Sequence, residues 1–300
     1  MSTGVVPYVA ERSHGLQRVC DYVELTKPKI VLLELVTVSV AAVLAATGLP
    51  NAWIVLNALV GTALVAAGAS AWNQWLERET DARMPRTAER PLPAGRLGGR
   101  GVVLFGSGLT LAGTAWLAWF VNPLTAGLGL ATWVFYVCIY TPLKSRSSAN
   151  TAVGAVAGAM PVLMGWSAVE GRFGLAVATL FVIVFLWQFP HFMAIAWIYR
   201  RQYAAAGMQM LSVVDPTGRR AGVQAVLAAL ALVPVSALPA VVSFAGPAYF
   251  VGALLLSLGQ LACAAWFLLR MNEDSARLLL RASLVYLPAL LAGLMIGPLT

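Results

Sequence analysis

The chain has 300 residues, of which 60% are hydrophobic and only 11% are charged, and its mean hydropathy is +0.79. Soluble domains carry about twice that share of charged residues, so the composition excludes an ordinary soluble domain and indicates a protein solvated by lipid. The net charge of +8 could indicate nucleic-acid binding, but its distribution along the chain argues against that class. Cys20, Cys138 and Cys263 have neither metal-ligand spacing nor a paired framework.

Nine stretches are long and apolar enough to cross a bilayer as helices, since one span needs about 20 residues. They are residues 29–48, 53–73, 102–120, 124–140, 151–169, 174–197, 221–244, 248–270 and 278–298. We therefore predict an all-α membrane protein of about nine transmembrane helices. A polar N-terminal segment, 1–28, precedes a single transmembrane domain, 29–300.

The basic residues lie almost entirely on one side of the predicted spans. Nineteen of the 20 lysines and arginines precede the first span or fall in alternate connections, and only Arg172 lies on the other side. Because positively charged loops stay in the cytoplasm, this predicts a cytoplasmic N-terminus, an outside C-terminus and cytoplasmic loops near 74–101 and 198–220.

The segment that continues the second span carries a cluster of oxygen-bearing side chains. Asn73, Glu77 and Asp81 recur every four residues, so on a helix they share one face, while Glu79 points to roughly the opposite side. Three oxygen ligands at a membrane boundary suit Mg²⁺, which also binds phosphates. The alternative is that these are ordinary solvated charges of a loop.

Arginines follow the predicted end of this helix, which Pro85 should terminate by about Arg83. Arg83, Arg86 and Arg90 then lie on an irregular segment, where guanidinium groups can bind phosphate oxygens in a two-pronged geometry. They could instead serve only the membrane topology. Together with the neighbouring carboxylates, they favour a carboxylate–Mg²⁺–diphosphate site.

Six motifs are spread along most of the chain. The first runs from Asn73 to Leu92. The others are LTKPKI from Leu25, YTPLKSR from Tyr140, the run from Gly154 to Pro161, WQFPHF from Trp187, and the AG-xx-ML segment from Ala206. Together they resemble the motifs of the UbiA-type intramembrane prenyltransferases, and within that family those of the haem-modifying branch. The resemblance implies a prenyltransferase helical bundle in a bacterial inner membrane.

The resemblance also implies a reaction and its partners. A farnesyl group would pass from farnesyl diphosphate to a vinyl group of protohaem IX, with water added, to give haem O. Mg²⁺ would be the cofactor, haem a substrate, and a downstream haem A synthase or terminal-oxidase assembly a partner. No nucleic acid is implied.

The site residues divide by expected role. The metal ligands are Asn73, Glu77 and Asp81. The groups that would neutralise the diphosphate are Lys27, Arg83, Arg86, Arg90, Lys144, Arg146 and Arg201. The haem-binding residues are His191 and Gln188, and the catalytic set is Asn73, Glu77, Asp81, Lys144 and His191.

The chain departs from the family's usual motifs at a few positions. Glu77 stands where Asp is usual, which keeps the charge and lengthens the arm, and Gln209 stands where Pro is usual. Arg201 and Gln202 occupy positions that are often acidic, so a second carboxylate-held Mg²⁺ is not expected. We therefore expect the 74–101 loop to hold the metal and the 198–220 loop mainly to supply positive charge.

Two residues inside the predicted spans keep alternative interpretations. His191 is a candidate haem or active-site group because ionisable residues in spans are usually functional, or it makes a helix-to-helix hydrogen bond beside Pro190. Glu34 either makes a structural hydrogen bond or lines a cavity.

Two other functions compete with haem farnesylation. A related prenyltransferase could act on a quinone or chlorophyll precursor, and His191 within WQFPHF distinguishes the two. A transporter would carry charged or broken-helix sites near the bilayer midplane, whereas the charges here gather at one face.

Overall fold

The computed structural model describes residues 14–242 and 245–296, and nine segments within them are long and apolar enough to cross a membrane. Eight are single helices: α2 (Pro28–Ala45), α3 (Ala52–Asp81), α4 (Gly99–Phe120), α7 (Asn150–Val169), α8 (Leu175–Ile198), α11 (Arg219–Val241), α12 (Pro247–Arg270) and α13 (Glu273–Ile296). The remaining span joins α5 (Pro123–Trp133), the π-helix η1 (Val134–Tyr140) and α6 (Thr141–Leu143). The predicted all-α membrane fold is confirmed. Arg12 and the last residues of the predicted spans 221–244 and 278–298 lie outside the described residues.

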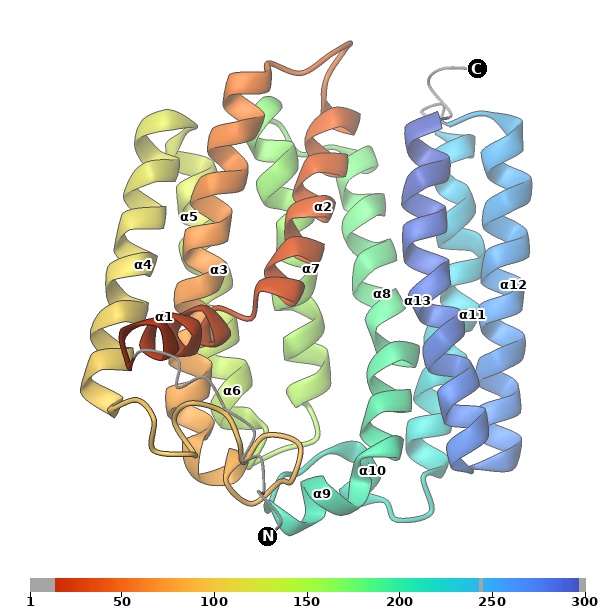
Figure 1. Cartoon of the computed structure of the whole chain (residues 1–300). Coiled ribbons are helices and arrows are strands. Elements are labelled where there is room, and N and C mark those ends of the chain that lie inside the picture. Colours follow the sequence, from red (N-terminus) through yellow and green to blue (C-terminus); the bar gives the residue numbers. More distant parts are fainter. Residues whose placement is uncertain (1–13, 243–244, 297–300) are drawn as a thin grey trace, which may run out of the picture.

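The spanning helices run side by side in one bundle (Figure 1). Helix α2 packs against α3 and α7, α8 packs against α7, α11 and α13, and α12 lies between α11 and α13. Successive spans alternate in direction. The long connection 82–98 and the short helices α9 (Arg200–Ala205) and α10 (Leu211–Val214) therefore lie at the same, lower end (Figure 1).

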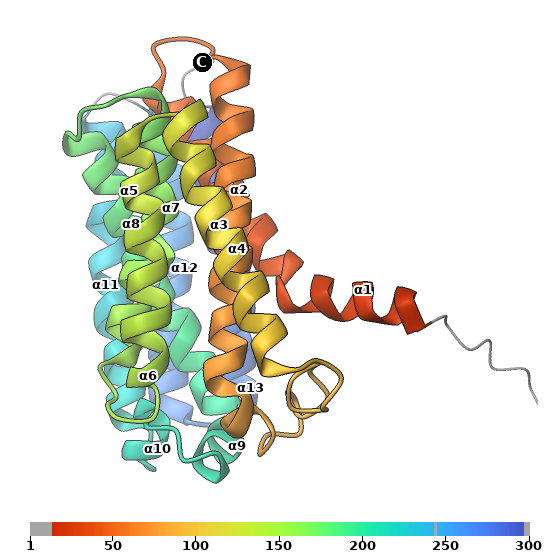
Figure 2. The same ribbon diagram turned by 90° about the vertical axis from the view of Figure 1, so that its left-hand side faces the viewer.

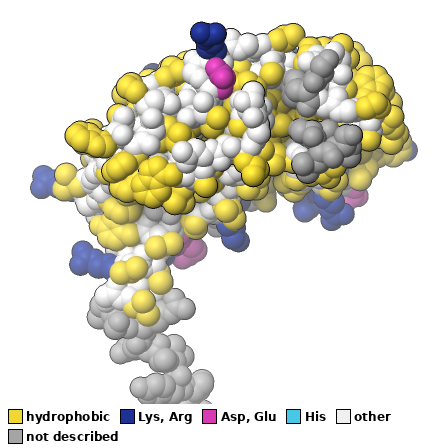
Figure 3. Space-filling model, turned by 90° about the horizontal axis from the view of Figure 1, so that it is seen from above, with side chains coloured by type: hydrophobic (Ala, Val, Ile, Leu, Met, Phe, Trp, Pro, Cys, Tyr) yellow, Lys and Arg dark blue, Asp and Glu magenta, His cyan; other side chains and the backbone are white. Residues whose placement is uncertain are grey.

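The two ends of the bundle differ in charge. The alternation of spans places Arg172, between α7 and α8, at the upper end, and the other basic residues of the described chain toward the lower end. Seen from above, the upper end is largely apolar and uncharged, with its charged side chains near the outline (Figure 3). The predicted one-sided distribution is therefore a property of the folded bundle.

Small residues let the helices approach closely. Gly68 of α3 faces Gly106 of α4, and a Cβ on Gly68 would lie 2.7 Å from the Gly106 carbonyl oxygen. Seven residues earlier, Gly61 faces Gly113 in the same way, and its Cβ would lie 3.3 Å from the Gly113 carbonyl oxygen. Because lipid provides little hydrophobic drive between helices, such close packing is the main source of their association.

The N-terminal segment, expected to be a polar stretch, contains the helix α1 (His14–Leu25), which points away from the bundle (Figure 2). Leu16, Val19 and Val23 share one face of α1 and are 54%, 59% and 52% exposed. Asp21 is buried and accepts a hydrogen bond from Arg96 Nε at 2.9 Å, which ties α1 to the 82–98 connection. An amphipathic helix that projects sideways from the bundle and exposes an apolar face fits the membrane interface.

Candidate active site

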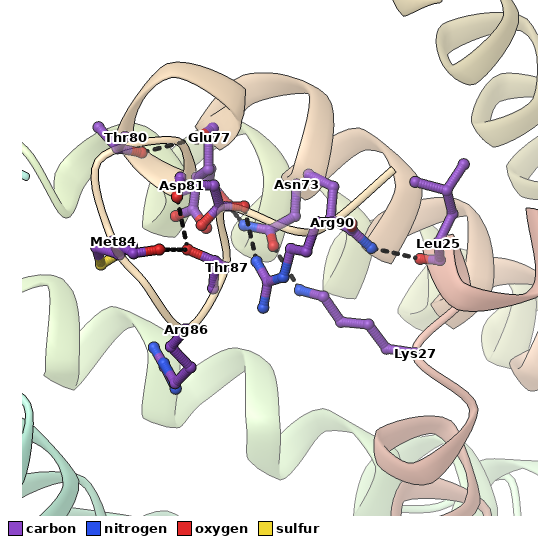
Figure 4. A network of polar contacts seen from close by, with 12 residues as sticks. Leu25, Lys27, Asn73, Glu77, Thr80, Asp81, Met84, Arg86, Thr87 and Arg90 are labelled. Atoms are coloured by element: carbon purple, nitrogen blue, oxygen red, sulfur yellow. Dashed lines mark hydrogen bonds and ion pairs between the residues drawn. The ribbon is translucent and has the colours of Figure 1, made fainter. Parts of the chain in front are cut away.

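The lower end of α3 presents one polar face to the inside of the protein, as its four-residue spacing predicts. Asn73, Glu77 and Asp81 are 0%, 7% and 1% exposed, and they lie along one side of the helix (Figure 4). Glu79 points elsewhere, since its side chain is 74% exposed and pairs with Arg78 at 3.0 Å. Burying three oxygen-bearing side chains is costly unless each has a partner, so the face requires cations or donors.

Lys27 supplies the partner of Asn73. It sits at the start of α2 with φ of 50°, a left-handed conformation that non-glycine residues rarely adopt and that is often found at functional sites. Its Nζ donates to Asn73 Oδ1 at 2.6 Å (Figure 4), and Asn73 Nδ2 donates to Thr141 Oγ1 at 3.0 Å. Burial, together with the charge of Arg90, lowers the pKa of Lys27 to about 7.

The two carboxylates of this face each hold a cation. Lys144 Nζ lies 2.7 Å from Glu77 Oε1, and Arg90 Nη1 donates to Asp81 Oδ2 at 2.7 Å. Burial favours the neutral form of Lys144, but Glu77 outweighs it and holds the pKa of Lys144 well above its usual range. Three cationic side chains therefore surround the polar face of α3. Lys27 comes from the start of α2, Arg90 from the 82–98 connection and Lys144 from the end of α6.

The π-helix η1 brings aromatic rings to the same place. Thr141 Oγ1 donates to the Tyr136 carbonyl at 2.8 Å, and Lys144 Nζ lies 4.6 Å from the centroid of the Tyr140 ring. Gly154 of α7 makes room for that ring, since a Cβ there would lie 2.7 Å from Tyr140 Cε2. π-Helical turns are rare in proteins, and those that occur are often found at functional sites. No residue pattern in this span predicts one.

The connection 82–98 folds back over the end of α3 and meets the second polar loop. Thr87 Oγ1 donates to the Asp81 carbonyl at 2.8 Å. Arg86 points away from Asp81 (Figure 4). Its guanidinium carbon lies 4.6 Å from the Tyr199 ring centroid, and its Nη2 lies 3.4 Å from the Tyr203 hydroxyl. The loops near 74–101 and 198–220 are therefore in contact.

Two glutamines of the second loop stand where the motifs usually have other residues. The Gln209 N–H donates to the Lys144 carbonyl at 2.7 Å, and Asn150 Nδ2 donates to the Gln209 carbonyl at 3.2 Å. A proline at 209 has no N–H to make the first bond. Gln202 Oε1 is buried and has no hydrogen-bond partner among the described residues, which leaves one oxygen available in this loop.

Three of the predicted diphosphate ligands stay apart from this network. The side chains of Arg83, Arg146 and Arg201 are exposed and make no hydrogen bond or ion pair within the part of the chain that the structure describes. They add positive charge to the lower end without contacting Asn73, Glu77 or Asp81. Lys27, Arg90 and Lys144 are the predicted cations that make this contact.

His191 faces α13. Its Nδ1 lies 2.9 Å from Ser283 Oγ, and the Ser283 hydroxyl donates to the Leu280 carbonyl at 2.7 Å. Because that carbonyl can only accept, the arrangement favours a proton on His191 Nδ1 and a free lone pair on Nε2. Trp187 stacks on the imidazole at 5.0 Å between centroids and donates from Nε1 to the Ser283 carbonyl at 2.7 Å.

The other polar residues of the spans have different surroundings. Gln188 is buried and donates to the carbonyls of Ala155 and Val184 at 2.9 and 3.1 Å, and Gly158 leaves space for its amide. The bond to Ala155 joins α8 to α7. Glu34 of α2 is half-buried and has no ion-pair partner among residues 14–242 and 245–296, so both of its interpretations stand.

The polar face of α3 fits a hard divalent cation that keeps some of its ligands as water or phosphate. In the described chain no three His, Cys, Asp or Glu side chains gather closely enough to hold a metal, so the amide of Asn73 is a needed third oxygen. Each of the three oxygens already has a cationic partner. The face is therefore arranged to attract positive charge.

Comparison with known proteins finds a matching family and relatives that cover nearly the whole chain. The sequence profile described as the UbiA prenyltransferase family matches residues 35–287. A protoheme IX farnesyltransferase of Solibacter usitatus is 44% identical over 288 residues, covering 92% of this chain and 97% of that protein. One of Koribacter versatilis is 40% identical and covers 99% of both.

Solved structures share the fold. A digeranylgeranylglyceryl phosphate synthase superposes with a TM-score of 0.78 at 16% identity, over 94% of this chain and 98% of that one. A UbiA homologue from Archaeoglobus fulgidus bound to DMAPP and Mg²⁺ gives 0.64 at 15% identity, over 92% and 99%. At these identities the likeness concerns the architecture of the helical bundle.

Proposed function

Since this chain belongs to the UbiA prenyltransferase family, we propose that it transfers the farnesyl group of farnesyl diphosphate to a vinyl group of protohaem IX, giving haem O and diphosphate. One observation carries the proposal: relatives named protoheme IX farnesyltransferase match nearly the whole chain at 40–44% identity. The buried cluster of oxygens and cations at one membrane face supports the same chemistry.

The reaction is balanced with one molecule of water. The bond between farnesyl C1 and the diphosphate oxygen breaks, and the allylic carbon bonds to the terminal carbon of the vinyl group. Water adds its oxygen to the inner vinyl carbon, and one proton is released. The barrier lies largely in separating an anionic leaving group from a carbocation, so catalysis here depends on electrostatic stabilisation.

The cations of the network are placed to bind that leaving group. Lys27, Arg90 and Lys144 contact the polar face of α3, and we propose that they also bind the phosphate oxygens of farnesyl diphosphate. Arg86 and the exposed Arg83, Arg146 and Arg201 would add to the positive field. Guanidinium groups suit phosphate through paired hydrogen bonds.

Asn73, Glu77 and Asp81 would hold Mg²⁺, and Gln202 Oε1 is a buried neutral oxygen of the second loop without a hydrogen-bond partner among the described residues. Bound there, Mg²⁺ supplies positive charge to the diphosphate as it leaves. The apolar helices around the site would keep water away from the farnesyl carbocation until the vinyl group reacts with it.

His191 and Gln188 are the proposed haem-binding residues. Ser283 would orient the imidazole of His191 and leave Nε2 free to bind iron. In metal-binding histidines, a hydrogen-bond partner on the other ring nitrogen commonly fixes the orientation of the ring in this way. Gln188 would support haem binding mainly by holding α7 against α8.

We expect His191→Ala to lose specific haem binding and Ser283→Ala to weaken it about tenfold or more, because the serine orients the ring. Absorbance titration of the purified protein with haem measures both, and the position of the Soret band reports ligation. Thr179→Ala, which removes a hydroxyl bonded only within α8, is the control. An unchanged Soret band in His191→Ala would show that this residue does not ligate iron.

We further propose that the protein lies in a bacterial inner membrane with the lower end of the bundle facing the cytoplasm. The support is the charge difference between the two ends, since arginine and lysine favour the cytoplasmic side. A downstream haem A synthase or terminal-oxidase assembly would then take the product from the same membrane.

The proposed function is tested by incubating membranes that contain the protein with haem, farnesyl diphosphate and Mg²⁺. We expect haem O, identified by mass, and no haem O when Mg²⁺ is chelated. Turnover of an aromatic quinone precursor without haem O would favour the related prenyltransferase function. Haem flux in proteoliposomes without covalent product would favour a transporter.

A further inference from the structure

A groove on the surface of the bundle lies between α8 and α11 and is separate from the site described above. Its volume is about 750 Å³. Phe185 and Phe189 of α8 form one wall, Val223 and Leu227 of α11 form the other, and Leu211 of α10 closes the lower end. Val223 and Leu227 are 38% and 60% exposed, so the groove opens to the surroundings of the helices.

The groove faces away from the proposed haem-binding residue. Phe185 and Phe189 each lie two positions from Trp187 or His191, which on an α-helix is a rotation of about 200°. Since Trp187 and His191 face α13, the two phenylalanines face the other side of α8. None of the groove residues contacts Asn73, Glu77 or Asp81, so the reaction described above leaves the groove without a role.

The lower end of the groove is cationic. Arg219 and Arg220 line it, are exposed, and have no side-chain hydrogen bond or ion pair within the described residues. Asp215 is the carboxylate in the lining. Its oxygens accept from the Thr217 hydroxyl at 2.6 Å and from the Arg220 backbone N–H at 2.8 Å, and these bonds lower its pKa. The carboxylate thus has Thr217 and the Arg220 N–H as partners, while neither guanidinium group has a hydrogen-bond or ion-pair partner among the described residues.

We propose that this groove binds an anionic phospholipid, with its phosphate on Arg219 and Arg220 and an acyl chain along Phe185, Phe189 and Leu227. Seven residues of helix separate Arg220 from Leu227, a rise of about 10 Å, so the groove runs from headgroup depth into the hydrocarbon region. Basic pockets between spanning helices at a cytoplasmic face favour anionic lipid headgroups.

The chemistry of the groove argues against the substrate as its occupant. A prenyl diphosphate in this chain has the buried oxygens of α3 available for its metal, whereas the one carboxylate of the groove is already satisfied. The groove also opens along its length, which suits a lipid that exchanges with the bilayer.

The test uses the full chain reconstituted in phosphatidylcholine vesicles with a minor share of phosphatidylglycerol, then native mass spectrometry after mild detergent extraction. We expect phosphatidylglycerol to be enriched on the protein and the enrichment to fall about tenfold or more in Arg219→Gln/Arg220→Gln. Val223→Trp should lower it without a change of charge by filling an exposed wall of the groove.

Arg270→Gln/Arg281→Gln is the matched control, because it removes two positive charges at the same end outside the groove. It should retain the lipid. Equal loss in both double variants, or full retention in Arg219→Gln/Arg220→Gln, would overturn the proposal. Displacement of phosphatidylglycerol by farnesyl diphosphate would also overturn it and assign the groove to the substrate. Haem O formation does not enter this measurement, so it can succeed or fail independently of the proposed function.

Discussion

Asp81→Ala is expected to lower haem O formation by about 10²–10³-fold, the effect of removing one group that stabilises the leaving charge. Asp81 is 1% exposed, lies at the end of the polar face of α3 and holds Arg90 at 2.7 Å. Its loss removes a proposed metal ligand and also releases the guanidinium that should bind phosphate. The measurement is turnover of haem and farnesyl diphosphate in membranes, at matched amounts of inserted protein.

Glu79→Ala is the control for this experiment, because Glu79 belongs to the same helix end but points outward. It should leave turnover nearly unchanged. Asp81→Asn keeps the shape of the side chain and removes only its charge, so it separates loss of chemistry from loss of folding. Near-normal turnover in Asp81→Asn, with the variant well inserted, would rule out a metal-binding role for this carboxylate.

The spans and the polar face of α3 could be predicted because each follows from a single strong constraint. In lipid, every backbone polar group must be bonded within its helix, so a spanning segment needs a long apolar run that is visible in the sequence. Asn73, Glu77 and Asp81 share a face because their spacing matches the helical period. Both features depend only on residues that are close together in the sequence.

The pairing of oxygens with cations could not be predicted, because it depends on how distant segments meet. Lys27 and Asn73 are 46 residues apart, and the sequence offers six other candidate cations for the same site. Which of them reaches α3 depends on the left-handed turn before α2 and on the fold of the 82–98 connection. Arg83, of the same cluster as Arg90, is left exposed.

Helix α1 and the π-helix η1 were missed for different reasons. The average polarity of residues 1–28 conceals the apolar residues Leu16, Val19 and Val23, whose spacing would have indicated an amphipathic helix. The π-helical turn around Tyr136 and Tyr140 adds one residue to a turn within an apolar run, and neither composition nor period records that insertion.

Gly165→Val is expected to destabilise the bundle strongly. A Cβ on Gly165 of α7 would overlap the carbonyl oxygen of Val38 in α2 and lie 2.9 Å from its carbonyl carbon. The neighbour is backbone rather than a flexible side chain, so α2 must move. Overpacking of this kind costs about 1–3 kcal/mol or more, and thermal unfolding in detergent should show a lower transition temperature.

The effect should reach the active site, because Lys27 directly precedes α2. Displacing α2 would move Lys27 from Asn73, so Gly165→Val should lose turnover even where the protein remains folded. Gly127→Ala is the control: Gly127 lies in α5 with nothing within 4 Å of a Cβ, and alanine there should be neutral or stabilising by about 0.5–1 kcal/mol. Wild-type stability in Gly165→Val would mean that α2 and α7 are not in the close contact described here.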